Sequence, residues 1–313
     1  MTYDAIIIGG GAAGLFCAIE AGKRGRRTLV IEHNQQVGRK ILISGGGRCN
    51  FTNLDTTPEN FISENPHFCK SALARFTPAD FIRLVRKYRI DYYEKKLGQL
   101  FCRDNSRQIV DMLLAECSRA GVEIKVGCKV DAMSSDNRFR LDTTLGQLEA
   151  ENVVIATGGL SYPKIGATGF GYKIADQFGI ERTKTRPSLV ALVANVPGGH
   201  SKLAGISVDA IAACGKNSFR ENILFTHRGL SGPAILQISN YWKSGDSVSI
   251  DLLPETGVRE LLEANRDRTQ KTAANFISEF LPQRFVEHLA GSSFPNKPLN
   301  KLNDAEIDRI AKA

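Results

Sequence analysis

Residues 3–14 read YDAIIIGGGAAG, and this stretch decides the fold. The apolar run that precedes the glycines is typical of a parallel strand covered on both faces, and the glycines predict a tight turn into a helix. Leu15, Ala18 and Ile19 supply the apolar face of that helix. A second apolar strand at residues 28–32 completes a strand-helix-strand unit of about 30 residues. We therefore predict an α/β fold.

The glycines of this turn follow the pattern Gly-x-Gly-x-x-Gly. In that pattern the first glycine permits the tight turn, the second lets a pyrophosphate approach the backbone, and the third lets helix and strand pack closely. Glu32 ends the second strand, where its carboxylate can accept hydrogen bonds from both hydroxyls of a ribose and disfavour a 2′-phosphate. The alternative is a glycine-rich turn in an ordinary α/β protein. We predict a dinucleotide site that includes Gly9, Gly11, Ala12, Ala13, Gly14 and Glu32.

Composition excludes several classes of protein. The 313 residues are 42% hydrophobic and 24% charged, which suits a globular chain of two or three domains. No apolar run reaches the roughly 18 residues that a membrane span needs, and the apolar start is expected to be a strand, not a signal peptide. Seven scattered cysteines without a Cys-x-x-Cys pair indicate neither a disulfide framework nor a metal site. We expect a cytoplasmic protein without a bound metal.

The rest of the first domain alternates helices and strands. Thr77 followed by Pro78 predicts the start of a helix, and Ser106 is expected to cap another one. A strand at residues 122–124, a hairpin around residues 138–148 and a strand at residues 153–156 follow. These elements extend the Rossmann-like domain to residue 186.

Two further modules are expected after a domain change at residues 186 and 187. Alternating apolar and polar residues at 189–196, 206–212 and 248–252 predict a β-rich module over residues 187–254. The pattern then becomes helical and polar, which predicts a small helical module over residues 255–313.

Two later glycine-rich turns favour FAD over NAD as the dinucleotide. A backbone-rich loop lies close after the acid, and the strand at residues 153–156 runs into another close-approach turn. No second fingerprint follows a strand, so a separate nicotinamide domain is not expected, and NAD(P)H would act only as a transient reductant. Beyond the fingerprint, the cofactor-binding residues are predicted to include Lys40, Ser44, Gly46, Gly47, Arg48, Cys49, Asn50, Val130, Ala156, Thr157, Gly158 and Gly159.

Four motifs together resemble the bacterial BaiN/YhiN-type flavoproteins, some of which are described as aminoacetone-oxidase-like. They are the glycine start with Glu32, the loop at residues 44–53, the segment at residues 156–171 and the segment at residues 226–233. The resemblance covers essentially the whole chain and places it in the glutathione-reductase-like FAD superfamily. It implies an FAD-dependent oxidoreductase that transfers a hydride between the flavin and an unidentified small molecule.

The C-terminal end departs from this resemblance. Similar proteins end with a further strand and a glycine-rich, acid-containing segment that returns to the first domain and contacts the flavin. The present sequence ends in helical material, and no such turn follows Gly291. We expect either that the chain is a fragment, which we favour, or that it encloses FAD less completely.

The residues on the reactive side of the flavin are less well defined by sequence. Because the flavin is itself the electron sink, a strong general base is not required, and the catalytic residue stays unassigned. Candidates for a substrate or proton contact are His227, Tyr162 and Lys40; the alternatives are a surface or packed histidine, a residue that ends a turn, and a solvated lysine. The ring or substrate side is predicted to include Tyr162, Pro163, Gly229, Ser231, Gly232 and Pro233, the last three as a helix start capped by the serine.

Two alternatives to a small-molecule enzyme are open. An RNA-modifying flavoprotein is suggested by a basic stretch, but acidic residues interleave with it and no RNA-binding motif is present. The net charge of +8 favours anionic partners without requiring RNA, so nucleic acid is not expected as a partner. The third reading is a non-catalytic flavin-binding protein, and the oligomeric state is left open. The basic stretch comprises Arg83, Arg86, Lys87, Arg89, Lys95, Lys96, Arg103 and Arg107.

Overall fold

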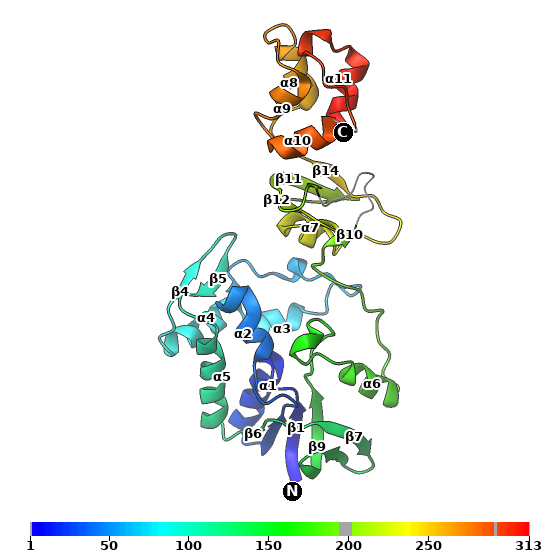
Figure 1. Ribbon diagram of the computed structural model, residues 1–313. Coiled ribbons are helices and arrows are strands. Elements are labelled where there is room, and N and C mark those ends of the chain that lie inside the picture. Colours follow the sequence, from blue (N-terminus) through cyan, green and yellow to red (C-terminus); the bar gives the residue numbers. More distant parts are fainter. Residues whose placement is uncertain (1, 194–201, 291–292, 313) are drawn as a thin grey trace. The chain divides into compact units, whose positions relative to one another are not determined.

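A computed structural model describes residues 2–193, 202–290 and 293–312 (Figure 1). The chain divides into two compact units, Met1–Thr183 and Lys184–Ala313. The division into three parts with boundaries after residues 186 and 254 stays a prediction. Within the described residues, no helix is both long enough and apolar enough to cross a membrane.

The first unit is built on a six-stranded sheet with the strand order β6-β2-β1-β9-β8-β7. The first four of these strands run parallel, and the last two pair antiparallel with their neighbours. The central pairing joins β1 to β9, with Ile8 opposite Ile155. The strands are β1 (Thr2–Ile8), β2 (Thr28–Ile31), β6 (Glu123–Lys125), β7 (Val130–Ser135), β8 (Phe139–Thr143) and β9 (Gly146–Ile155).

Apolar side chains cover both faces of this sheet, as the unbroken apolar run of β1 predicts. Ile7 belongs to a core shared with Leu15 of α1 and Leu113 of α5. Ile6 belongs to a second core shared with Leu141 of β8. The helices of the unit are α1 (Ala12–Lys23), α2 (Arg39–Ile43), α3 (Lys70–Arg75), α4 (Pro78–Lys87), α5 (Arg107–Arg119) and α6 (Phe170–Gln177).

Local signals at helix starts were partly misleading. Thr77 caps α4 as predicted, since its hydroxyl accepts a hydrogen bond from the backbone N–H of Asp80. Ser106 precedes α5 but does not cap it, because its hydroxyl donates to the carbonyl oxygen of Leu42 at 2.7 Å. The strand expected at residues 153–156 is the end of the longer β9.

A small sheet of order β3-β5-β4 lies beside α4 in the same unit. Its strands are β3 (Asn50–Asn53), β5 (Gln99–Cys102) and β4 (Tyr92–Glu94), all antiparallel. One face packs inward, where Phe51 contacts Tyr92 and Phe81 through their rings. None of these three strands was predicted, because each is only three or four residues long.

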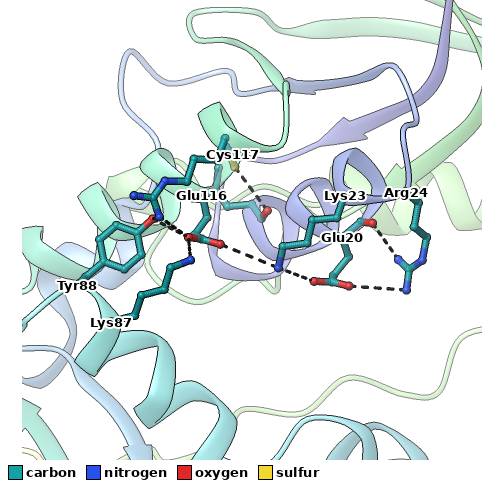
Figure 2. Close-up of polar contacts among 9 residues, drawn as sticks. Glu20, Lys23, Arg24, Lys87, Tyr88, Glu116 and Cys117 are labelled. Atoms are coloured by element: carbon teal, nitrogen blue, oxygen red, sulfur yellow. Dashed lines mark hydrogen bonds and ion pairs between the residues drawn. The ribbon is translucent and has the colours of Figure 1, made fainter.

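A buried carboxylate ties α5 to the end of α4 (Figure 2). Glu116 accepts hydrogen bonds from the Lys87 Nζ at 2.7 Å and the Tyr88 hydroxyl at 2.6 Å, and it pairs with Arg119 at 3.2 Å. Burial raises the pKa of this carboxyl, but the hydrogen bonds from Lys87 and Tyr88 and the charges of Lys87 and Lys23 lower it to about 2. Glu116 is therefore an ionised structural link on this side of the unit.

The second unit combines an antiparallel sheet with helices over one apolar core. Its strand order is β10-β13-β12-β11-β14. Only β10 falls within the alternating segment predicted at 189–196, and residues 194–196 lie outside the described residues. The elements are β10 (Leu192–Val193), β11 (Ser207–Cys214), β12 (Asn217–Thr226), β13 (Gly229–Ser231), β14 (Ser249–Asp251), α7 (Pro233–Ile238), α8 (Val258–Asn265), α9 (Ala273–Ile277), α10 (Gln283–Ala290) and α11 (Asp304–Ala311).

Candidate cofactor site

A cavity of about 340 Å³ lies in the first unit, where β1 and β2 end and α1 begins. The carboxyl ends of parallel strands are where α/β sheets bind their ligands. The structure brings ten of the predicted cofactor residues to its wall. They are Gly9, Gly11, Ala12, Ala13, Glu32, Lys40, Val130, Ala156, Thr157 and Gly158.

Two of the three fingerprint glycines lie where a side chain would clash, and the third borders open space. Gly9 has a φ of +112°, and a Cβ there would lie 2.5 Å from the Ala156 carbonyl oxygen. A Cβ on Gly14 would lie 1.9 Å from the carbonyl oxygen of Gly9, so this glycine permits the contact between helix and turn. A Cβ on Gly11 would meet no atom within 4 Å, because this glycine borders the open cavity. Gly11 thus leaves room for a ligand beside the backbone.

The N-terminus of α1 offers hydrogen-bond donors to the cavity. The first amides of a helix have no partner within the helix, and their end carries a partial positive charge. Gly11 supplies no side-chain cap, and no acidic residue occupies the first turn of α1. Ala12 and Ala13 line the cavity, so this end is suited to a pyrophosphate.

Glu32 is held in position by its neighbours at the base of the cavity. Its side chain is only 9% exposed. One carboxylate oxygen accepts a hydrogen bond from the backbone N–H of Gly10 at 2.9 Å. The other accepts from the backbone and side chain of Asn34, at 2.9 and 2.7 Å. This arrangement fixes a negative charge where a ribose diol would bind.

Sequence reasoning missed several residues of the cavity wall. Among them Arg39 donates to the Asn34 side chain at 2.7 Å, and Lys129 precedes Val130 at the start of β7. Arg39 follows the acid closely and was a usable signal, whereas Lys129 is distant in sequence and joins the cavity wall only through folding. The missed residues are Ile8, Gly10, Ile31, His33, Asn34, Gly38, Arg39, Ile41, Cys128, Lys129, Ile165, Gly166, Ala167, Thr168 and Phe170.

The second glycine loop forms a separate turn after α2. Gly45, Gly46 and Gly47 have φ values of +57°, +67° and +84°, a left-handed run that favours glycine. A Cβ on either Gly46 or Gly47 would meet no atom within 4 Å. The predicted residues of this loop do not line the cavity, and neither do Gly14 and Gly159, so their contacts with a cofactor stay predictions. The loop residues are Ser44, Gly46, Gly47, Arg48, Cys49 and Asn50.

The segment after β9 contacts Lys40 of the cavity wall. Lys40 donates hydrogen bonds to the Gly159 carbonyl oxygen at 3.1 Å and the Ser161 hydroxyl at 3.3 Å. Tyr162 is 63% exposed and has a φ of +62°, which is uncommon for a residue with a bulky side chain. It precedes Pro163, the first residue of a short 3₁₀ turn. Neither Tyr162 nor Pro163 lines the cavity.

Comparison with known families agrees with this geometry. The model of the family described as HI0933-like protein Rossmann domain matches residues 3–291. The chain belongs to this family. The predicted fold class, an α/β protein with a Rossmann-like FAD-binding domain, is confirmed. The finer resemblance to BaiN/YhiN-type proteins stays a prediction.

Curated relatives of this HI0933-like chain carry the names of enzymes. It is 49% identical over 307 residues to the ribosomal RNA dihydrouridine synthase of Escherichia coli, covering 96% of this chain and 77% of the relative. It is 48% identical to the protein of the same name from Haemophilus influenzae, covering 90% and 72%. It is 27% identical to the 3-dehydro-bile acid delta(4,6)-reductase of Clostridium scindens, covering 98% and 80%.

These relatives correct one expectation. The sequence suggested that nucleic acid would not be a partner, since acidic residues interleave with the basic stretch. That prediction is wrong, because the two relatives at almost half identity are named for an action on ribosomal RNA. Charge interleaving along a sequence is a poor guide, because folding decides which charges pair.

The remaining predicted residues of the HI0933-like chain belong to its second unit. His227 is exposed in the turn between β12 and β13, and Gly229 begins β13. Pro233 is the first residue of α7, as predicted. The predicted serine cap is wrong, because Ser231 ends β13 and Gly232 occupies the cap position without a side-chain hydrogen bond. A substrate or ring-side role for these residues stays a prediction.

The residues of the cavity fit the adenosine diphosphate half of FAD. Glu32 presents a fixed carboxylate for the ribose, and the start of α1 presents amides for the pyrophosphate. The open space beside Gly11 admits the phosphates close to the backbone. Arg39, Lys40 and Lys129 add positive charge to the same wall.

Proposed function

We propose that this chain is an FAD-dependent oxidoreductase that reduces uridine to dihydrouridine in ribosomal RNA. The observation that carries the proposal is the 49% identity over 307 residues to a relative named for that activity. The cavity supports it, because its residues suit the dinucleotide that such a reduction would use. A cytoplasmic location is part of this proposal.

In this proposal the first unit holds the cofactor. Glu32 orients the adenosine ribose, and the amides of Ala12 and Ala13 bind the pyrophosphate. Gly46 and Gly47 leave their backbone accessible for the flavin half. When bound, FAD would supply the hydride, with NADH or NADPH as the source of electrons.

The chain itself must position the uracil ring and deliver a proton. Conversion of uridine to dihydrouridine adds two hydrogens across the C5–C6 double bond, one as a hydride and one as a proton. We propose His227, Tyr162 and Lys40 as candidate proton donors, since each bears a titratable group. Lys40 has the best-defined environment of the three, because it bonds to the segment that follows β9.

A second candidate is the reduction of a small molecule. It is favoured by the Clostridium scindens relative, which aligns with 98% of this chain and is named as a reductase of a bile acid. The two candidates share the cofactor and differ in the acceptor. Sequence identity favours the RNA substrate, because the chain is 49% identical to the relative named for ribosomal RNA and 27% identical to the one named for a bile acid.

The test combines a spectrum with an RNA assay. The purified protein is expected to bind FAD and to bleach under anaerobic NADH or NADPH. Ribosomal RNA from a strain that lacks the corresponding gene is then added, and its nucleosides are quantified by mass spectrometry. New dihydrouridine that requires both protein and reductant supports the proposal. Flavin that is reduced but yields no dihydrouridine rejects the RNA substrate in favour of a small molecule.

A further inference from the structure

One face of the small sheet β3-β5-β4 carries a pair of stacked aromatic rings. Tyr93 and Phe101 are directly opposite each other on β4 and β5. Their ring centroids are 6.0 Å apart, with an interplanar angle of 27°. Alternation along β4 places Tyr92 on the other face, where it contacts Phe51. Phe101 is buried, whereas Tyr93 is half-buried.

Two cationic side chains contact this pair of rings. The Lys95 Nζ lies 5.4 Å from the centre of the Phe101 ring, and an Arg48 Nη1 donates to the Tyr93 hydroxyl at 3.4 Å. Both side chains are exposed. Glu94 is the acidic neighbour, but alternation turns it to the other face, and its carboxylate accepts a hydrogen bond from the Gly98 backbone at 3.1 Å. We call Arg48, Tyr93, Lys95 and Phe101 the stacking patch.

Folding pairs part of the basic stretch of residues 83–107 with carboxylates of the chain. On the helical side, Arg83 pairs with Asp80 and Arg107 with Asp111, while Lys87 binds the buried Glu116. Within the described parts of the chain, no ion pair is found for Lys95 or for Arg48 of the stacking patch. The cations of the patch therefore remain open to an external anion, whereas Arg83, Lys87 and Arg107 pair with carboxylates of the chain.

The stacking patch adjoins the second glycine loop. A Cβ on Gly45 would lie 2.7 Å from the Phe101 ring, so the loop packs directly against the inner member of the stack. Asn50 of the same loop is opposite Phe101 in the sheet. A ligand on the patch would thus lie beside the loop that is predicted to contact the flavin.

We propose that the stacking patch binds a single-stranded segment of the substrate RNA next to the reduced base. An aromatic face with flanking cations is the arrangement that binds single strands, since bases stack on the ring and phosphates meet the cations. This inference rests on the proposed function, because it names the contact through which that substrate is held. Tyr93 and Lys95 act as positioning residues in this proposal.

The test measures RNA binding separately from turnover. The full chain with bound FAD is titrated against a fluorescein-labelled oligouridine of 12 nucleotides, and anisotropy is recorded at several salt concentrations. Tyr93→Leu is expected to weaken binding about fivefold or more, since a base–aromatic stack contributes on the order of 1 to 3 kcal/mol. Tyr93→Trp should restore it. Lys95→Gln should weaken binding and lower the salt slope by about 1.

Arg83→Gln is the matched control. It removes a cation from the same basic stretch, but one that already pairs with Asp80, so binding should change less than twofold. FAD content and bleaching by reductant should equal the wild type in all variants, which shows that the fold and the cofactor site are intact. In the dihydrouridine assay, Tyr93→Leu should raise KM more than it lowers kcat.

The possible outcomes separate this proposal from the proposed function. If the wild type binds RNA and Tyr93→Leu and Lys95→Gln bind it equally well, the stacking patch is not the RNA contact, although the RNA substrate still stands. If the wild type binds no RNA and makes no dihydrouridine, the proposed function itself is wrong, and the proposed role of the stacking patch is wrong as well.

Discussion

The carboxylate of Glu32 accepts a hydrogen bond of 2.9 Å from the backbone N–H of Gly10. This bond connects the end of β2 to the middle of the glycine turn that follows β1, and the two strands pair in parallel up to Ile8 and Ile31. The acid therefore has two tasks: it orders the turn and presents its charge to the cavity. Both tasks require the carboxylate to stay beside these donors.

Replacement of this acid should release the cofactor. Glu32→Gln keeps the size of the side chain but loses the charge that a ribose diol and the Gly10 and Asn34 donors share. Hydrogen bonds to charged groups contribute about 1.5 to 3 kcal/mol, so we expect FAD affinity to fall about tenfold to a hundredfold. Titration of the apoprotein with FAD, followed by flavin fluorescence, measures this. Glu20→Gln on α1 is the control, and equal affinity in both variants would contradict the assigned role of Glu32.

Two glycines of the fingerprint should respond differently to alanine. Gly14→Ala places a Cβ 1.9 Å from the Gly9 carbonyl oxygen, whereas Gly11→Ala places one in open space. We expect Gly14→Ala to lower the free energy of unfolding by about 2 kcal/mol or more, by overpacking. Gly11→Ala should leave the apoprotein as stable as wild type and weaken FAD binding. Thermal unfolding with and without FAD distinguishes them, and an equal loss of stability in both would refute this division.

The buried ion pair of Glu116 should appear in the pH dependence of stability (Figure 2). Its pKa is lowered from 4.5 to about 2 in the folded protein, so its contribution is complete above pH 4.5 and is lost as pH falls towards 2. At pH 7 we expect Glu116→Gln to lower the free energy of unfolding by on the order of 2 kcal/mol. The effect is reduced because water around the exposed lysines screens part of the ion pairing. Urea unfolding at pH 7 and pH 3 should show the difference from wild type shrinking at pH 3. Glu149→Gln, which pairs with Arg140 outside this cluster, is the control and should show no such change.

The buried thiols should resist alkylation in the folded protein. Burial raises the pKa of Cys102 to about 12 and that of Cys117 to about 11. Since the thiolate is the reactive form, iodoacetamide at pH 8 should leave both unmodified. Cys69 is only half-buried and should react first. Peptide mass spectrometry before and after unfolding in urea checks this, and rapid labelling of native Cys102 would show that its strand opens.

The cofactor turn was the most predictable part of the molecule. A glycine pattern, the helix after it and an acid at Glu32 constrain one another over 30 residues of continuous chain. Short-range signals outside this unit were less reliable. Ser106 is of a residue type that commonly caps helices, but its hydroxyl donates to the carbonyl oxygen of Leu42, 64 positions away. No local sequence pattern predicts that this distant acceptor replaces the cap.

The sequence by itself determined the class of fold and the kind of ligand, because the strand, turn, helix and acid are local and their chemistry is carried by residue type. Only the tertiary structure decided which charges are available. Lys87 and Lys95 are both basic residues of one stretch, yet the first is neutralised by Glu116 from another helix and the second lies over the Phe101 ring. Coulomb pairing depends on distance in space, and sequence spacing does not define that distance.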